Sequence, residues 1–468
     1  MKLTDPNRLF PVDPQQRDLA CALYSSVSDL PILSPHGHCD PRWFAENVRF
    51  SNPADLFVVP DHYVFRMLVS QGVSIADLGV PRVDGGPVET DPRKIWNRFA
   101  GAAKLFRGTP TALWLDHSFE HVFGIDQILN EATADVIYDQ IQAKLATDAY
   151  RPRALFDRFN IELLATTEGA LDDLRWHRDI KNSGWQGKIV TTYRPDAVVD
   201  PEFDEFKQNI IELGEITGED TTTWQGYLAA HRARRAFFKT FGATATDHGH
   251  PSAATANLDD EDAGALYAII LSGDFTTQHA EKFRGQMLTE MAKMSLDDGL
   301  TMQIHAGSRR NHSSDVFTQF GRDKGFDIPG RTDYVAALKP LLDAVGMEPD
   351  LTIILFTLDE TAYARELAPL AGAYPALNLG PPWWFFDSFE GIKRFREATT
   401  ETCGFYNTAG FNDDTRAFCS IPARHDVSRR SDSAYLSTLV STGRLREADA
   451  FEVAHDLAYG LAKTAYNL

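Results

Sequence analysis

Short apolar stretches recur along the chain, and segments with helical periodicity separate most of them. A strand buried on both faces has a continuous apolar run instead of an alternating one, as in parallel sheets covered by helices. We therefore predict eight parallel strands, of which the last two have the weakest apolar signal. The expected strands are Leu30–His38, Ile161–Thr167, Lys188–Arg194, Ala243–His248, Met302–Ala306, Leu351–Thr357, Ala376–Leu379 and Phe405–Gly410.

Helices are expected between these strands. Residues 133–145 place apolar side chains on one helical face, and Thr361–Ala368 can form the helix after the sixth strand. The segment between the first two strands, roughly residues 40–160, is too long for an ordinary crossover. We expect it to be a mainly helical insertion over the mouth of an α/β fold, a (β/α)8 barrel, in a single domain that covers residues 1–468.

The composition favours a folded globular protein with a large core. Hydrophobic residues make up 43% and aromatic residues 11% of the 468 residues. There is no apolar run of about 18 residues, and Met1–Pro6 lack the apolar region of a signal peptide, which favours a cytoplasmic protein. A net charge of −20 disfavours binding to nucleic acid or to an anionic membrane. The four cysteines have no CxxC spacing and are expected to be reduced.

His36 and His38 are the leading candidate metal ligands. They occupy alternate positions at the end of the first expected strand, so both rings can reach one ion. An isolated His-x-His is a weak signal, but a position at the carboxyl end of a barrel strand favours chemistry. The natural closing ligand is a carboxylate from the last expected strand, which the segment Asp413-Asp414-Thr415-Arg416 can supply, although adjacent acids in a loop are usually only solvated.

Asp61-His62-Tyr63, in the expected insertion, is a candidate acid–base group. His62 is expected to titrate near neutrality, and Tyr63 can donate or accept a proton. A surface turn after Pro60 is an equally good interpretation of this spacing. Trp383-Trp384 adds aromatic surface beside the seventh strand, where core packing is the simpler role and the wall of a sugar pocket is the alternative.

Arginines at the ends of expected strands are candidates for carboxylate recognition. Arg194 ends the third strand, Arg310 and Asn311 follow the fifth, and Arg416 follows the eighth. A single arginine usually forms a salt bridge. In a strongly acidic protein, however, an anionic substrate needs local cations, and three arginines suit the bidentate recognition of a carboxylate and sugar hydroxyls.

Together these motifs resemble the uronate isomerases (glucuronate isomerases) of the amidohydrolase superfamily, in order along nearly the whole chain. The matching motifs are His36-x-His38, Asp61-His62-Tyr63 with Arg66, Ala165-Thr166-Thr167, Arg194-Pro195-Asp196, Asp247-His248, Gln303-x-His305-x-Gly307 with Arg310-Asn311, Trp383-Trp384-Phe385 with Asp387, Asp414-x-Arg416-x-Phe418, and Arg424-His425 with Arg429-Arg430. Departures at Glu168-Gly169-Ala170, in residues 308–314 and at Asp413 leave the metal set intact and leave the substrate preference open.

The resemblance implies a barrel of the metal-dependent hydrolase type and an aldose–ketose isomerase. It implies conversion of D-glucuronate to D-fructuronate and of D-galacturonate to D-tagaturonate, by proton transfer through a cis-enediol. One divalent ion, with zinc expected, would be held by His36, His38 and Asp414, with His305 as a further ligand or a hydrogen-bond partner. The implied catalytic residues are His62, Tyr63, Asp414 and Arg416, and the implied substrate-binding residues are Arg194, Arg310, Asn311, Trp383, Trp384 and Arg416.

Two alternatives remain open. A metal-dependent amidohydrolase or lactonase on the same barrel would use the same ligands, although no strand-end lysine that could bridge two ions follows the fourth stretch. A non-catalytic sugar-acid-binding protein would need the arginines and aromatic residues but neither His62, Tyr63 nor a metal. The expected partner is a small hexuronate, and a homo-oligomer is compatible with the sequence.

Overall fold

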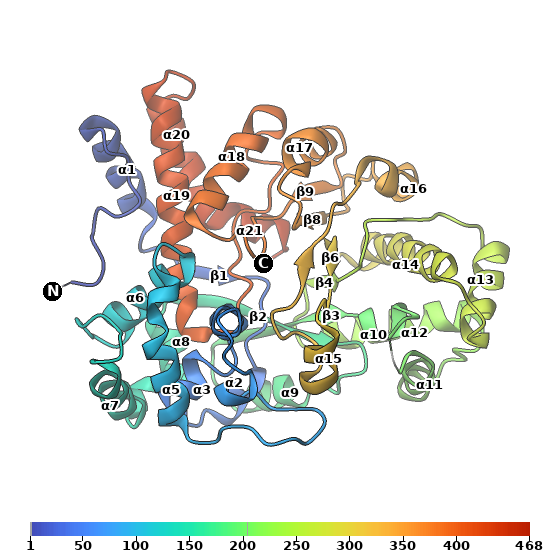
Figure 1. The fold of residues 1–468 in the computed structure, drawn as a ribbon. Helices are drawn as coiled ribbons and strands as arrows, with labels where there is room; N and C mark the ends of the chain where they lie inside the picture. The colour runs from blue at the N-terminus through green and yellow to red at the C-terminus, as the bar shows by residue number, and fades with distance from the viewer. Residues whose placement is uncertain (1, 204) are drawn as a thin grey trace.

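A curved parallel sheet of seven strands lies at the centre of the computed structural model, which describes residues 2–203 and 205–468 (Figure 1). All neighbouring strands in this sheet are parallel, in the order in which they are named here. The strands are β1 (Ile32–Ser34), β2 (Ile161–Gly169), β3 (Lys188–Arg194), β4 (Ala245–His248), β5 (Thr301–Ala306), β8 (Ile353–Thr357) and β9 (Leu377–Leu379). Seven of the eight predicted stretches therefore contain a strand. A separate antiparallel pair, β6 (Ser308–Arg309) and β7 (Ile328–Pro329), lies outside the sheet.

The eighth predicted strand, Phe405–Gly410, is wrong as a full strand. Only Thr408 pairs with the sheet, as a parallel bridge to Leu379 in β9, because residues 404–407 form a turn and Gly410 adopts a left-handed φ of 72°. The chain still returns to the first strand's end, where the His38 amide donates to the Thr415 carbonyl at 3.0 Å. This contact links the loop after β1 to the segment after Thr408, and the fold is an α/β barrel whose eighth position is reduced to a bridge.

The first strand is shorter than predicted. Pro31 and Pro35 bracket β1, and proline cannot donate a hydrogen bond to a neighbouring strand. The two histidines consequently lie in the loop after β1 and not in the strand itself. Their convergence must therefore be explained by loop contacts and not by strand alternation.

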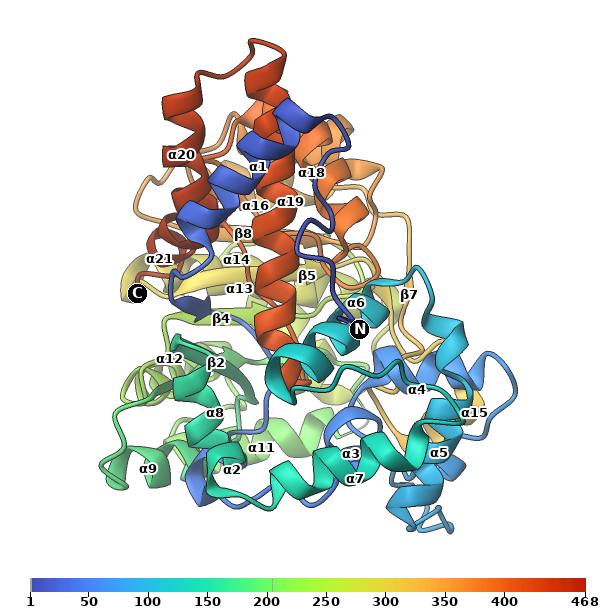
Figure 2. The same ribbon diagram turned by 90° about the vertical axis from the view of Figure 1, so that its left-hand side faces the viewer.

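Helices alternate with the strands and cover the outside of the sheet (Figures 1 and 2). They are α9 (Arg175–Asn182), α10 (Asp196–Val199), α11 (Phe206–Thr217), α12 (Trp224–Lys239), α13 (Asp260–Ser272), α14 (Thr277–Asp298), α15 (Ser314–Phe320), α16 (Val335–Val345), α17 (Ala368–Ala371), α18 (Phe389–Cys403) and α19 (Ile421–Ser441). The expected helix Thr361–Ala368 is a π-helical turn, Tyr363–Leu367, that continues into α17. In Figure 2, α1 (Pro14–Val27) and α20 (Glu447–His455) pack against the same side of α19 and against each other.

The segment between β1 and β2 is helical. It contains α2 (Pro41–Glu46), α3 (Pro53–Phe57), α4 (His62–Val69), α5 (Pro92–Gly101), α6 (Pro110–His117), α7 (Ala134–Leu145) and α8 (Pro152–Arg158). Five of these helices begin after an Asp, Asn or Thr whose side chain accepts a backbone N–H, as N-caps do. Their apolar side chains form one cluster with Ile161 of β2 and Ile189 of β3. This packing favours one domain over two, although the single-domain organisation stays a prediction. Among the described helices, none has the length and apolar character that a membrane span requires.

Candidate active site

A small cavity of about 60 Å³ lies where the loops after the strands meet the insertion. It brings together almost all the side chains that the sequence singled out. Its lining includes His36, His38, Asp61, His62, Tyr63, Arg194, Asp247, His305, Arg310, Asp323, Asp327, Trp383, Trp384, Asp414, Thr415 and Arg416. Asn311 does not line it. The backbone N–H of Asn311 donates to the Asp327 carboxylate at 2.8 Å, at a left-handed φ of 52°.

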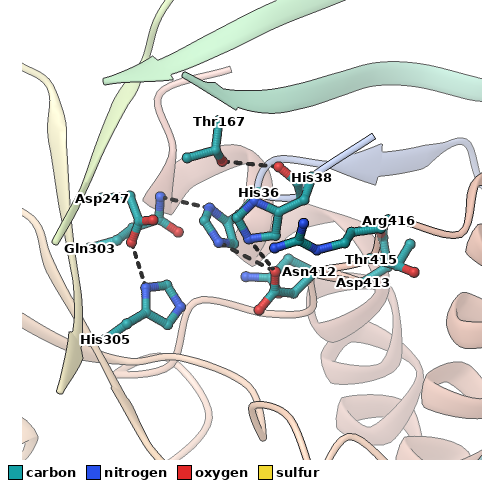
Figure 3. Close-up of polar contacts among 12 residues, drawn as sticks. His36, His38, Thr167, Asp247, Gln303, His305, Asn412, Asp413, Thr415 and Arg416 are labelled. Carbon is teal, nitrogen blue, oxygen red and sulfur yellow. Dashed lines mark hydrogen bonds and ion pairs between the residues drawn. The ribbon is translucent and has the colours of Figure 1, made fainter. Parts of the chain in front are cut away.

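The loop after β1 is held by β2 on one side and by the segment that carries Asp414 on the other. The hydroxyl of Thr167 in β2 donates to the Gly37 carbonyl at 2.9 Å, and His38 donates through its backbone to Thr415 (Figure 3). These two contacts hold the histidines on either side of Gly37. Both rings therefore face the segment that carries Asp414.

His36, His38 and Asp414 form a set of donors that fits one divalent ion. Asp414 Oδ1 lies 3.5 Å from Nε2 of His36 and 3.1 Å from Nε2 of His38. Burial lowers the pKa of His36 to about 4, so the ring is neutral at pH 7, as a metal ligand must be. Asp414 is held at a left-handed φ of 39°, a strained conformation for a residue other than glycine. Two imidazoles and one carboxylate are typical donors for zinc.

His305 belongs to a second group of close ligand-type atoms, formed with His36 and Asp247. Asp247 is already engaged, because Oδ1 lies 2.6 Å from Nδ1 of His305 and Oδ2 lies 3.2 Å from the Arg194 guanidinium. A cation here would face that guanidinium at close range, which disfavours a second ion. Nε2 of His305 is buried and has no hydrogen-bond partner among the described residues. It is therefore available for a ligand (Figure 3).

Tyr63 sits at the start of α4 and is protonated in its resting state. Its hydroxyl donates to Asp387 at 2.7 Å, and Arg424 donates to the same carboxylate oxygen at 2.6 Å. Burial raises the pKa of Tyr63 well above its ordinary value, and the adjacent Asp387 raises it further. The sequence motifs that resemble the uronate isomerases include Asp387 and Arg424, but they assigned neither residue a role. In the structure they form the acidic and basic partners of this tyrosine.

His62 differs from expectation in its titration. We expected it to titrate near neutrality, but burial, followed by the positive charge of Arg416, lowers its pKa to about 3. Its ring stacks on Trp384 with centroids 4.7 Å apart, and the Trp383 ring meets His305 edge to face at 4.7 Å. His62 is therefore a neutral imidazole at pH 7, and both tryptophans pack against histidines of the site.

The three arginines converge on the cavity, each beside an acid. Arg194 donates to Asp196 at 2.8 Å, and Arg310 donates to Asp327 at 2.9 Å. Arg416 has only a long contact of 3.4 Å, to Asp323, and its side chain is 36% exposed. Of the three, Arg416 is thus the least committed to a protein partner.

Asp323 and Asp327 were missed by the sequence analysis. They lie in the loop between α15 and β7, far along the chain from any predicted strand end. One sequence signal could have indicated them. Both acids lie in a glycine-containing segment after Arg310, and a cluster of arginines needs carboxylates nearby to balance its positive charge. Asp323 faces Arg310 at 3.7 Å as well as Arg416.

Comparison with known proteins matches the whole chain to one family of enzymes and to solved structures with the same fold. The family model described as glucuronate isomerase matches residues 14–466. A uronate isomerase of Mesorhizobium japonicum is 65% identical over 466 residues, which cover 100% of this chain and 99% of that protein. The crystal structure of glucuronate isomerase from Caulobacter crescentus has a TM-score of 0.98 at 58% identity, covering 99% of this chain and 97% of that chain. The uronate isomerase structure from Thermotoga maritima has a TM-score of 0.91 at 26% identity, covering 99% of each chain.

Proposed function

The chain belongs to the glucuronate isomerase family, and we propose that it converts D-glucuronate to D-fructuronate and D-galacturonate to D-tagaturonate with one bound divalent ion. The observation that carries this proposal is the cavity itself. It combines a carboxylate and two histidines with three arginines and a neutral His–Tyr pair. A metal site, an anion clamp and proton-transfer groups are the three parts that isomerisation of a sugar acid requires.

His36, His38 and Asp414 would hold the ion, with zinc as the proposed metal and His305 Nε2 as a further available donor. When bound, the ion supplies Lewis acidity toward the carbonyl and hydroxyl oxygens of the open-chain sugar. Asp247 keeps His305 in place through Nδ1, so the ring presents its other nitrogen to the site.

The resting protonation states of His62 and Tyr63 suit opposite halves of a proton transfer. Neutral His62 can accept the proton from C2 of the aldose, which gives a cis-enediol, and can return that proton at C1. Tyr63, protonated and backed by Asp387, can donate a hydrogen bond to the oxygen on which charge develops. In this scheme the hydrogen bond from Arg424 holds the Asp387 carboxylate beside Tyr63.

The arginines would bind the carboxylate of the uronate. Arg194 and Arg310 are held by short contacts to Asp196 and Asp327, which fix their positions. Arg416 has the longest contact and the most exposed head group, so it is proposed to make the direct bidentate contact. The two tryptophans would form the wall of the pocket through their packing on His62 and His305.

Product identification tests this function against its two rivals. The purified protein, loaded with zinc, is incubated with D-glucuronate or D-galacturonate, and the products are separated by chromatography. The proposal predicts a ketose from at least one uronate. A hydrolase would instead open a lactone or cleave an amide without forming ketose, and a binding protein would return the sugar unchanged.

The route of the proton is tested by running the reaction in deuterated water. Transfer through a base that exchanges with solvent predicts deuterium at C1 of the ketose. Complete absence of label at C1 would favour a hydride shift and would refute the role proposed for His62.

A further inference from the structure

Gly249 lies beside two of the three arginines that would bind the sugar acid. It follows β4 directly, and β4 pairs with β3 on one side and with β5 on the other. Arg194 is the last residue of β3, and Arg310 comes directly after β6, the short strand that follows β5 along the chain. The order of the strands thus explains why the backbone of Gly249 comes close to both guanidinium groups.

A side chain at position 249 would collide with this pair of arginines. A methyl group placed on Gly249 would lie 2.4 Å from Nη2 of Arg194 and 2.9 Å from Nη2 of Arg310. It would also lie 2.8 Å from Oδ2 of Asp196. Non-bonded heavy atoms are most stable about 3.5–4.0 Å apart. The close approach of the two guanidinium groups therefore depends on the absence of a side chain at this position.

The backbone of Gly249 does not itself require glycine. Its φ lies outside the left-handed region, so alanine would meet no backbone strain there. Its N–H donates to Oδ1 of Asp196 at 3.1 Å, and any residue but proline would keep this hydrogen bond. The need for glycine at this position comes from the side chains around it.

The acids that hold the two arginines contact other nitrogens than Nη2. Arg194 uses Nε for Asp196 and Nη1 for Asp247, and Arg310 uses Nη1 for Asp327. Asp247 and Asp327 are at most 2% exposed, so they hold the arginines from the protein interior. Both arginines line the cavity, and their Nη2 atoms lie side by side next to Gly249. Two neighbouring guanidinium donors suit the oxygens of a carboxylate.

We infer that Gly249 is a positioning residue that keeps Arg194 and Arg310 close enough together to bind one sugar acid. The inference rests on the proposed function. Because the backbone tolerates alanine at position 249, the strain of an added methyl group would fall on the ends of the two arginine side chains. Their guanidinium groups would move apart, while the fold would stay as it is.

Gly249→Ala tests this role, and Gly86→Ala is the matched control. A methyl group on Gly86 would lie 2.4 Å from Nε and 2.8 Å from Cζ of Arg82, so the control creates the same kind of collision with a guanidinium. The φ of Gly86 also lies outside the left-handed region, and neither Gly86 nor Arg82 lines the cavity. Initial rates of ketose formation by zinc-saturated protein give kcat and KM for the uronate that the wild type converts. Thermal unfolding measures the stability of each variant.

We expect Gly249→Ala to raise KM roughly 10-fold, as the loss of one hydrogen bond to a charged group does. Its kcat should change little, because the arginines bind the substrate and its transition state alike. Gly86→Ala should keep both constants, and both variants should unfold at temperatures close to that of the wild type. Arg310→Lys keeps a cation beside Asp327 and removes Nη2. In that background the rise in KM caused by Gly249→Ala should be smaller by about twofold or more.

Other outcomes separate the possible failures. If the wild type forms no ketose from either uronate, the proposed function is wrong. If the wild type forms ketose and Gly249→Ala keeps its KM, the function stands and the role of Gly249 is refuted. A large fall in unfolding temperature confined to Gly249→Ala would also refute it, because the strain would then fall on the fold. An undiminished effect in the Arg310→Lys background would show that the methyl group does not act through the pair of arginines.

Discussion

Replacement of Arg416 by methionine tests the anion clamp most sharply. The change removes the guanidinium and keeps an unbranched side chain close in length to the arginine's aliphatic stem. Because the ion pair of Arg416 with Asp323 is long, at 3.4 Å, its loss breaks no short ion pair among the described residues. The effect on activity should consequently reflect lost substrate contact more than collapse of the site.

The magnitude follows from the environment of the guanidinium. A hydrogen bond to a charged group contributes about 1.5–3 kcal/mol, and the 36% exposure of Arg416 places it in the lower part of that range. A loss of about 1.5–2 kcal/mol corresponds to a roughly 10–30-fold fall in kcat/KM. Most of this change should appear as a higher KM, since a carboxylate remote from C1 and C2 is bound similarly in the ground and transition states.

The assay measures initial rates of ketose formation over a range of D-glucuronate concentrations with zinc-saturated protein. Arg444→Met is the control, because Arg444 is an exposed arginine paired with Glu401 at 2.7 Å and does not line the cavity. Its kcat/KM should match the wild type. An unchanged kcat/KM in Arg416→Met would show that this arginine does not hold the substrate.

Two further predictions concern buried ionisable side chains near the barrel. Burial raises the pKa of Glu168 from 4.5 to about 8. Between these pH values the carboxyl is protonated in the folded protein but ionised in the unfolded chain. The free energy of unfolding therefore falls as the pH rises from 4.5 to 8. Glu168→Gln should raise the free energy of unfolding in urea by up to about 3 kcal/mol at pH 7 and leave it unchanged at pH 4; an equal gain at both values would contradict this assignment. Arg424→Met strands the Asp387 carboxylate, which is only 11% exposed, and should cost about 3–5 kcal/mol. Arg444→Met breaks an exposed pair of nearly equal length and should cost about 0–1 kcal/mol; equal losses would refute the effect of burial.

Much of the fold could be predicted because its strands are buried on both faces. Continuous apolar runs marked seven strand positions, and the helix predicted over residues 133–145 is α7, Ala134–Leu145, which begins one residue later. The eighth position was overestimated because a single parallel bridge at Thr408 suffices to continue the sheet. Local sequence could not reveal this, since pairing there depends on the placement of β9 and the turn after α18.

The candidate site could be assembled in part because chemistry gathers at the carboxyl ends of barrel strands. This rule located His36, His38, Arg194 and Asp414, which all line one cavity. It could not reveal that burial lowers the pKa of His62 to about 3, because that shift arises from tertiary packing.

Residues supplied by distant segments were also beyond reach. Asp323 enters from a loop after α15, and Gly249, which follows β4, lies beside Arg310 after β6. Neither position has a local pattern that identifies its partner in the folded chain. Long-range contacts of this kind become visible only once the barrel is closed.

The most direct test of the account is the metal dependence of isomerisation. The protein is stripped with a chelator, its zinc content is measured, and ketose formation from D-glucuronate is followed before and after zinc is restored, for the wild type and for Asp414→Ala, with Glu401→Ala as a surface control. We predict that the stripped wild type and Glu401→Ala are inactive and recover with about one zinc per chain, whereas Asp414→Ala neither retains zinc nor recovers. Metal-free wild-type protein that forms ketose at the rate of the loaded enzyme would contradict the account.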